Sequence, residues 1–372
     1  MTTRAFSAPT YIVSGIGALS EVAAAIDDAG AGRVAVVADR GVAENTQMLE
    51  RLISAVGDRD YVVLPFVAPD PTVADAESAA VAAAEADCGA VVAIGGGSAI
   101  ALAKAVCLLL RNPGPLLQYA GRDMAAQHPA PCIAIPTTAG SGSEVSNALV
   151  LHDPSLESIV VVRGRGYEPV ACILDGELLK TLPDRPLVDA ALDALSHALE
   201  AMWVKGRSAF TDAMAFAAAD RIYKLLPRAL EQRRVEDLQG LLEVSTMANL
   251  ACGPSGLGLV HALSSAARVH LPHGYQNGIL LPHVASFNRS EVGPDVAAEI
   301  DRLPALYQTI GVTPTFKAGE IDEEQAASMV RIGMASPLHH NNVRQADAAE
   351  LIELVAQAGV PRPPIATESI DG

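Results

Sequence analysis

Short apolar runs alternate with longer alanine-rich stretches through the first half of the chain. The alanine-rich stretches place apolar residues at helical spacing and lie at residues 45–56, 72–86 and 99–110. The short runs are rich in β-branched residues, as strands are, and lie at residues 34–38, 61–66, 90–94, 133–135 and 171–174. Alternation of strands with helices predicts a parallel sheet that helices cover on both faces. We therefore expect an α/β fold in this half.

The pattern changes after Leu182-Pro183. Long segments rich in alanine and leucine follow, and residues 187–359 carry hardly any strand signal. The length of 372 residues also suits two domains better than one, because single hydrophobic cores stop growing at about 250–300 residues. We predict an α/β domain over residues 1–180 and an all-α domain over residues 181–372.

Charge and cysteine content narrow the class of protein. The chain has 26 Lys and Arg against 43 Asp and Glu, a formal charge of −17, and no basic stripe that would neutralise phosphates. We therefore expect no nucleic-acid or membrane partner. The five cysteines are scattered, mostly within apolar runs, which is typical of reduced core residues. Without a signal-peptide pattern or an apolar run of about 20 residues, we expect a cytoplasmic protein.

Two glycine-rich loops follow predicted strands in the first half. Gly95-Gly96-Gly97-Ser98 ends one strand and opens a helix, so its backbone N–H groups could closely approach a pyrophosphate. The loop at residues 136–144 interleaves glycine with small hydroxyl residues that can hydrogen-bond a diphosphate or ribose. Two such loops predict one shared crevice for a dinucleotide in a Rossmann-like domain. The alternative for the first loop is a tight turn without a ligand.

Asp39 directly follows the strand predicted at residues 34–38. Its carboxylate could accept hydrogen bonds from an adenosine ribose and would repel a 2′-phosphate, which favours NAD over NADP. NADP stays open because the adjacent Arg40 could pair with such a phosphate. A role for Asp39 in capping the next element is the alternative.

A candidate metal site lies in the second half. Asp193 and His197 are four residues apart, on one face of a predicted helix. His261 and His273 lie downstream in an apolar, glycine-punctuated context, where a protonated side chain would be costly to bury. One carboxylate with three histidines suits Fe²⁺ or Zn²⁺.

The blocks Gly95–Ser98, Pro136–Glu144 and Asp193–Glu200 resemble the signature set of the iron-containing (group III) alcohol dehydrogenases. The segment from His273 to Pro282 resembles the closing motif of that family. The resemblance implies a dehydroquinate synthase-like fold with a dinucleotide in the cleft between the domains. It also implies a homodimer and Fe²⁺ ahead of Zn²⁺ as the ion. The cofactor contacts that it implies are Asp39, Gly96, Gly97, Ser98, Thr137, Thr138, Ser141 and, under the nicotinamide, Leu178. The metal ligands that it implies are Asp193, His197, His261 and His273.

The sequence departs from the family pattern in several places. Ala101 stands where the family usually has aspartate, and a lysine usually found after the second loop is absent around residues 155–158. The segment between His261 and His273 is about two residues short. Ser265 stands where many members carry a histidine credited with proton relay. Ser265 and His270 are our candidates for proton exchange, either directly or through water. A structural role beside Pro272 is the alternative for His270.

These residues predict an NAD(P)-linked alcohol dehydrogenase or carbonyl reductase. We expect hydride transfer between the nicotinamide and a small alcohol, aldehyde or oxo acid. Segments around His261 and Arg268 resemble branches of the family that act on short ω-hydroxy acids or phosphonoacetaldehyde-type aldehydes. Three alternatives stay open: a maleylacetate reductase-like enzyme, a lyase related to dehydroquinate synthase, and a degenerate member that binds without catalysis.

Overall fold

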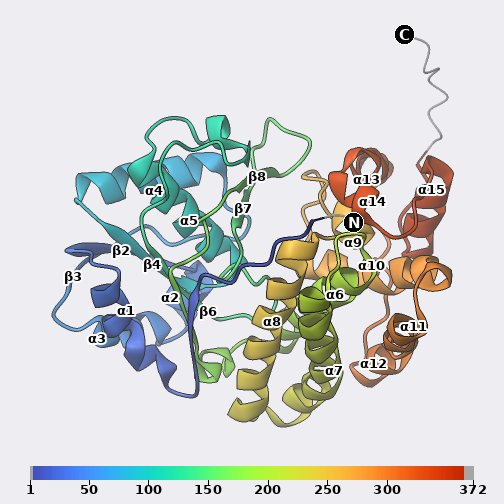
Figure 1. Ribbon diagram of the computed structural model, residues 1–372, viewed down its shortest axis with the longest axis horizontal. Coiled ribbons are helices and arrows are strands. Elements are labelled where there is room, and N and C mark those ends of the chain that lie inside the picture. Colours follow the sequence, from blue (N-terminus) through green and yellow to red (C-terminus); the bar gives the residue numbers. More distant parts are fainter. Residues whose placement is uncertain (1–2, 364–372) are drawn as a thin grey trace.

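The computed structural model describes residues 3–363 and contains a six-stranded sheet in its first half (Figure 1). The strand order is β1-β9-β6-β4-β2-β3, and every neighbouring pair is parallel. The strands are β1 (Tyr11–Ser14), β2 (Arg33–Ala38), β3 (Asp60–Val63), β4 (Ala90–Gly95), β6 (Cys132–Pro136) and β9 (Ala171–Leu174). The five strands predicted from the sequence are confirmed. In this sheet only β1 was not predicted, because it is short and mostly exposed at the sheet edge.

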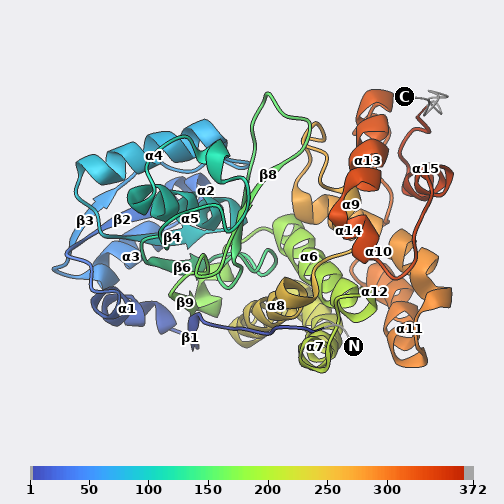
Figure 2. The same ribbon diagram turned by 45° about the horizontal axis from the view of Figure 1, so that its top comes forward.

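Helices cover both faces of this sheet, as the alternating pattern predicts. Figure 2 shows α4 and α5 on one side of the strands and α1 and α3 on the other. Their bounds, with that of α2, are α1 (Val22–Asp28), α2 (Arg40–Asn45), α3 (Met48–Val56), α4 (Val73–Glu85) and α5 (Gly97–Arg111). Strand β4 is completely buried between the two layers, which explains its uninterrupted apolar sequence.

A second, three-stranded sheet was not predicted. Its order is β5-β8-β7, with β5 (Gly121–Arg122), β7 (Ala148–Leu151) and β8 (Val160–Arg163). Strands β7 and β8 pair antiparallel, so the first half is not purely parallel. The residue pattern does not indicate this sheet clearly, because its strands have at most four residues and β7 exposes Val150 between buried neighbours.

The second half is helical, as predicted. Between residues 187 and 363 the structure has no strand beyond one isolated bridge from Ala266 to Ser158. The longer helices are α6 (Asp184–Trp203), α7 (Ala209–Gln232), α8 (Val235–Ser255), α10 (His273–Asn288), α13 (Glu323–Ala335) and α15 (Ala348–Gln357). The shorter ones are α9 (Leu259–Leu263), α11 (Pro294–Asp301), α12 (Leu303–Thr309) and α14 (Pro337–Asn341).

The predicted division near residue 180 falls in the connection between β9 and α6. A short 3₁₀ helix, Gly176–Leu179, lies in this connection. The division into two domains stays a prediction, and residues 364–372 of the second one lie outside the described range.

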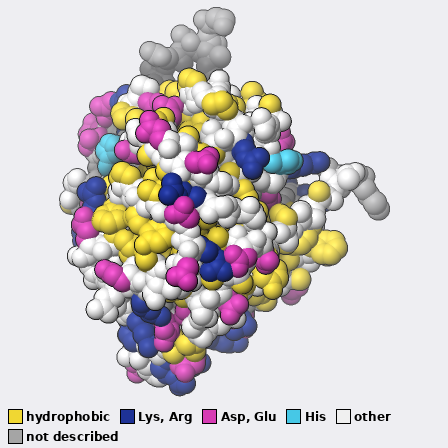
Figure 3. Space-filling view, turned by 90° about the vertical axis from the view of Figure 1, so that its left-hand side faces the viewer, with side chains coloured by type: hydrophobic (Ala, Val, Ile, Leu, Met, Phe, Trp, Pro, Cys, Tyr) yellow, Lys and Arg dark blue, Asp and Glu magenta, His cyan; other side chains and the backbone are white. Residues whose placement is uncertain are grey.

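None of the helices within residues 3–363 combines the length and the apolar composition that crossing a bilayer requires. On the face shown in Figure 3, Lys and Arg are interspersed with Asp and Glu.

Candidate active site

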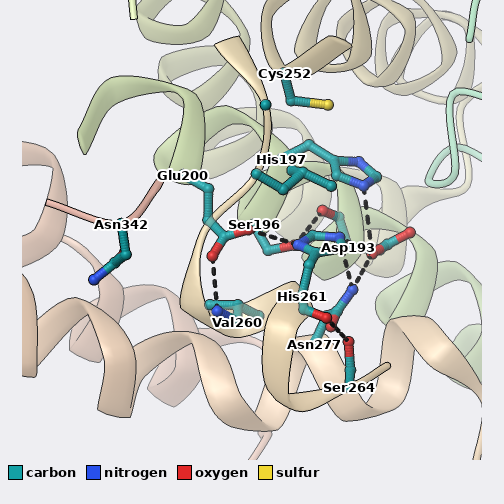
Figure 4. A network of polar contacts seen from close by, with 12 residues as sticks. Asp193, Ser196, His197, Glu200, Cys252, Val260, His261, Ser264, Asn277 and Asn342 are labelled. Atoms are coloured by element: carbon teal, nitrogen blue, oxygen red, sulfur yellow. Dashed lines mark hydrogen bonds and ion pairs between the residues drawn. The ribbon is translucent and has the colours of Figure 1, made fainter. Parts of the chain in front are cut away.

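A buried cluster of one carboxylate and two imidazoles lies in the helical half (Figure 4). Asp193 and His197 are one turn apart on α6, and His261 comes from the short helix α9. The Oδ1 atom of Asp193 is 3.9 Å from Nε2 of His197 and 3.8 Å from Nε2 of His261. One ligand atom of each of the three residues lies within 4.8 Å of the other two. This geometry brings together three of the four predicted ligands.

His273, the fourth predicted ligand, begins α10 and lies beside this group without belonging to its closest set. Asn277, one turn further along α10, connects His273 to the cluster. Its amide nitrogen is 2.7 Å from Oδ1 of Asp193 and 3.0 Å from Nε2 of both His261 and His273. Sequence reasoning missed Asn277, although a residue four positions after His273 on a helix shares its face.

Two glycines allow α10 to approach α6 closely. A Cβ atom on Gly274 would lie 2.5 Å from the carbonyl oxygen of Asp189. A Cβ atom on Gly278 would lie 2.9 Å from Cδ1 of Leu192. Both distances are shorter than real Cβ contacts, so larger residues would push the helices apart. The glycines therefore place His273 and Asn277 against Asp193.

Glu200 orients His261 and was also missed by sequence reasoning. Its side chain is completely buried on α6, where it accepts hydrogen bonds from the backbone N–H of Val260 at 2.7 Å and from Nδ1 of His261 at 2.6 Å. A proton on Nδ1 leaves the Nε2 lone pair of His261 free for a metal ion, as in other carboxylate–histidine–metal arrangements. The available signal was its position three residues after His197, on the same helix.

Burial and mutual charge determine the protonation of the cluster. Burial lowers the pKa of His197 to about 4 and also lowers the pKa of His273. Burial lowers the pKa of His261 too, but the adjacent Glu200 carboxylate outweighs it and leaves the pKa raised. For Asp193, burial opposes ionisation, yet the three imidazoles and Asn277 together lower the pKa. At neutral pH the cluster therefore presents an ionised Asp193 carboxylate and neutral His197 and His273, whereas Glu200 favours the protonated form of His261.

This donor set fits a divalent metal ion. A buried carboxylate without a compensating charge is costly, and a cation would neutralise it. Imidazole and carboxylate ligands suit Fe²⁺ and Zn²⁺ alike. The Nδ1 atom of His197 is buried and has no hydrogen-bond partner among residues 3–363, so this imidazole has an unsatisfied polar atom beside the cluster.

Most of the predicted cofactor residues follow the carboxyl ends of neighbouring strands of the parallel sheet. Asp39 follows β2, the first loop follows β4, and the second loop follows β6. These three strands are neighbours, so their carboxyl ends meet at that edge. A Cβ atom on Gly97 would lie 2.8 Å from both Cβ and Oγ of Ser141, and one on Gly96 would lie 3.4 Å from Oγ1 of Thr138. The two predicted loops therefore touch and form one backbone-lined surface.

Asp39 caps a helix, and Leu178 is buried in the core. The Asp39 carboxylate caps α2 by accepting hydrogen bonds from the backbone N–H groups of Gly41 at 2.8 Å and Val42 at 3.4 Å. The capping alternative for Asp39 is therefore observed, and its contact with a ribose stays a prediction. Leu178 follows β9 and has no exposed surface, and its contact with a nicotinamide also stays a prediction.

The second loop is held between the two halves of the molecule. A Cβ atom on Gly140 would lie 2.7 Å from the carbonyl oxygen of Ala190, three residues before Asp193. Asn249 on α8 donates a hydrogen bond to the carbonyl oxygen of Ser141 at 2.9 Å. The nucleotide loops and the metal cluster are thus direct neighbours.

A buried lysine fixes the far end of the same loop. Nζ of Lys104 donates to the backbone carbonyl oxygens of Ser143, Ser146 and Ala148. Burial lowers the pKa of Lys104 to about 8. Ala101, one turn earlier on α5, is buried in the core where the family pattern has aspartate.

The two candidates for proton exchange have different surroundings. The Ser265 hydroxyl donates to the backbone carbonyl oxygen of His261, so this side chain contacts the ligand segment directly. His270 is exposed on the segment that leads to α10. The loop after β7 covers this segment, because Arg268 and Arg331 both pair with Glu157, at 3.3 and 2.9 Å.

Comparisons with known proteins match nearly the whole chain. The family model described as iron-containing alcohol dehydrogenase matches residues 9–176, and the model of its C-terminal part matches residues 187–296. A Salmonella typhimurium protein described as a "probable alcohol dehydrogenase" is 31% identical, with 96% of this chain and 95% of that protein covered. An NAD-dependent methanol dehydrogenase of Bacillus methanolicus is 32% identical, with 82% and 80% covered.

Solved structures agree with this assignment. Sulfoacetaldehyde reductase from Bifidobacterium kashiwanohense, solved in complex with NAD⁺, superposes with a TM-score of 0.85. It is 28% identical to this chain, and the match covers 97% of this chain and 100% of that one. The sequence motifs, the fold and these matches agree, and the chain therefore belongs to the iron-containing alcohol dehydrogenase family of oxidoreductases acting on CH–OH groups.

Proposed function

We propose that this chain interconverts a small alcohol with its aldehyde or oxo acid by hydride exchange with a nicotinamide cofactor at the Asp193 cluster. The observation that carries the proposal is the contact between Gly140 and Ala190. It places a loop suited to a dinucleotide beside a buried donor set suited to a divalent ion. Hydride transfer needs this adjacency, because the carbon that takes the hydride must lie between the two groups.

The proposed ligands are Asp193, His197, His261 and His273. A divalent ion held by these residues would polarise the C–O bond of the substrate and lower the pKa of the alcohol. Glu200 keeps the proton of His261 on Nδ1, so that Nε2 faces the centre of the cluster. Burial of Asp193, His197 and His261 limits access of water, which strengthens the electrostatic interactions within the site.

Proton exchange with solvent is proposed for Ser265 and His270. Ser265 is half-buried and hydrogen-bonded to the ligand segment, whereas His270 faces solvent. A hydroxyl can both donate and accept, so Ser265 can pass a proton through water to the exposed imidazole.

The proposed cofactor is NAD, bound by Gly96, Gly97, Ser98, Thr137, Thr138 and Ser141. A negative Asp39 side chain at the carboxyl end of β2 disfavours the 2′-phosphate of NADP. The similarity to an NAD-dependent methanol dehydrogenase and to a reductase solved with NAD⁺ supports this choice. Fe²⁺ is the proposed ion, and Zn²⁺ is the alternative with the same ligands.

A homodimer is proposed from the edge of the large sheet. Strand β1 is an edge strand, and Tyr11, Ile12 and the following Ile16 are 69%, 38% and 50% exposed. An exposed apolar edge strand is a template for pairing with a second chain.

A cytoplasmic location is proposed because all five cysteines are free and buried in the described part of the chain, as in reducing compartments.

Metal removal and reconstitution test the proposed function. Purified protein is stripped with a chelator and reloaded with Fe²⁺ or Zn²⁺. NADH and NADPH consumption is then followed with short aldehydes, oxo acids and maleylacetate. We expect turnover only after reloading, and faster with NADH. Unchanged turnover of the stripped protein would overturn the metal role. Conversion without net change of the nicotinamide would indicate a lyase, and no conversion would indicate a non-catalytic binding protein.

A further inference from the structure

Asn277 makes more contacts to the metal cluster than any hydrogen-bond pattern of its side chain can satisfy. Its amide nitrogen lies within 3.0 Å of three acceptors, the Oδ1 atom of Asp193 and the Nε2 atoms of His261 and His273. A side-chain amide carries only two hydrogens, so one of the three acceptors is always without a partner. The nitrogen therefore stands at a point on which three ligand lone pairs converge.

The other end of the same amide is left without a partner. Oδ1 of Asn277 is buried and accepts no hydrogen bond from any residue in the range 3–363. The side chain has no exposed surface. An unpaired buried carbonyl oxygen has lost its hydrogen bonds to water without replacement, so this arrangement is unfavourable for the amide taken by itself. An amide can exchange its oxygen and nitrogen by a half-turn about its terminal bond.

We propose that Asn277 is a fifth residue of the metal site, whose amide N–H₂ group holds Asp193, His261 and His273 in place without an ion and turns its oxygen to the ion when one binds. The inference rests on the metal-dependent function proposed above. A cation repels the hydrogens of an amide and attracts its oxygen, so loading the site reverses the preferred orientation of the side chain. The reversal also gives the unpaired oxygen a partner.

The separations between atoms suit a ligand position. Neighbouring ligands of an ion about 2.1 Å away stand about 3.0 Å apart in octahedral and about 3.4 Å apart in tetrahedral coordination. The amide nitrogen of Asn277 lies 2.7–3.0 Å from its three neighbours, and a half-turn would place Oδ1 at the same point. Helix packing also fixes the position of the Asn277 side chain, because Gly274 and Gly278 on the same helix allow α10 to pack closely against α6.

Two substitutions separate the two roles of the amide. Asn277→Asp keeps an oxygen but loses the donor, and Asn277→Ala loses both. Each is treated with a chelator and then titrated with Co²⁺, a spectroscopic substitute, with binding followed by visible absorption. We expect Asn277→Ala to bind Co²⁺ about 10-fold to 100-fold more weakly than the native chain, the range typical of residues that orient metal ligands. Asn277→Asp should bind at least as tightly as the native chain.

The ion-free proteins give the second readout. Thermal unfolding without metal should rank the native chain first and Asn277→Asp last, because a carboxylate at position 277 faces the Asp193 carboxylate without an intervening donor. Co²⁺ should therefore raise the midpoint of unfolding most in Asn277→Asp. A merely structural asparagine would lower stability in both variants and leave the order of Co²⁺ affinities unexplained.

Asn288→Ala is the matched control. Asn288 is a fully buried asparagine on the same helix that exchanges hydrogen bonds with Asn342 and, among the described residues, has none to Asp193, His197, His261 or His273. It should lose stability but bind Co²⁺ as the native chain does. Native-like Co²⁺ affinity in Asn277→Ala would overturn the inference, as would an Asn277→Asp variant that binds as weakly as Asn277→Ala. Failure of the proposed function has another signature: His197→Ala would then bind Co²⁺ as well as the native chain.

Discussion

The two parts of the active site are built in different ways. The metal cluster consists of mostly buried side chains from α6, α9 and α10, which are far apart in the sequence. The nucleotide loops consist mainly of backbone and small side chains in contiguous stretches after β4 and β6. A side-chain site loses its function when one group is removed. A backbone site tolerates loss of side chains but is sensitive to added atoms, because the backbone itself must stay accessible.

The largest effect is expected from His197→Ala. Removing one of three closely grouped donors should abolish stable metal binding and lower kcat by more than about 1,000-fold, since the metal both polarises the substrate and lowers the alcohol pKa. Metal content after dialysis and steady-state kinetics measure this. His283→Ala is the control, because His283 lies on α10 and bonds only the carbonyl oxygen of Pro314 among the described residues. Turnover above one-tenth of native would contradict the view that this side-chain site fails when one group is removed.

On the nucleotide side, Lys104 should make stability depend on pH. Its pKa is lowered to about 8 in the folded chain from 10.5, so the unfolded chain binds more protons between these values. The free energy of unfolding should therefore rise with pH in this window, by up to about 3 kcal/mol relative to Lys104→Met, and be flat below it. Denaturant titrations from pH 7 to 10.5 measure the difference. Lys224→Met, an exposed lysine paired with Asp220, should track the native chain. Parallel curves for native and Lys104→Met would refute the buried-lysine effect.

Gly97→Ala adds an atom to the backbone site. Its Cβ would lie 2.8 Å from Ser141, so one of the two touching loops must move. We expect kcat/KM for NADH to fall by about 100-fold, because a displacement of this size in a positioning element has that effect. Metal content should not change. Gly253→Ala is the control, since a Cβ at Gly253 meets nothing within 4 Å. Equal loss of metal and cofactor binding would show that the two parts are not separable.

A smaller effect on the metal side is expected from Glu200→Gln. The neutral amide keeps the shape of the glutamate but holds the Nδ1 proton of His261 less strongly. Metal affinity should fall by about 10-fold to 100-fold, with NADH affinity unchanged. Competition with a calibrated chelator measures it. Glu243→Gln, at a glutamate that accepts hydrogen bonds from Ser14 and Gln239, should leave metal affinity as it is. An unaltered affinity in Glu200→Gln would remove Glu200 from the metal site.

The pattern of apolar residues determined most of the nucleotide half. Five of the six strands of the large sheet follow from short apolar runs. Four of them, β2, β4, β6 and β9, are buried on both faces and therefore have almost no polar positions. The glycine-rich loops are also local features, since the backbone freedom of Gly96 and Gly97 is a property of the residues themselves. The small sheet was missed because its strands are short and weakly patterned.

The grouping of the metal ligands required the tertiary structure. The spacing of Asp193 and His197 identified one pair, and family resemblance added His261 and His273. Spacing along the chain carries no information on how α9 and α10 approach α6. The packing of α10 through Gly274 and Gly278 decides this, and with it the position of Asn277.

The sequence by itself thus determined the fold class, the two loops and one carboxylate–imidazole pair, because each depends on residues close together in the chain. Only the tertiary structure decided that Glu200 orients His261 and that Asn277 stands where three ligand lone pairs converge. Hydrogen bonds between different helices depend on distances of a few tenths of an ångström, and helix packing alone fixes those distances.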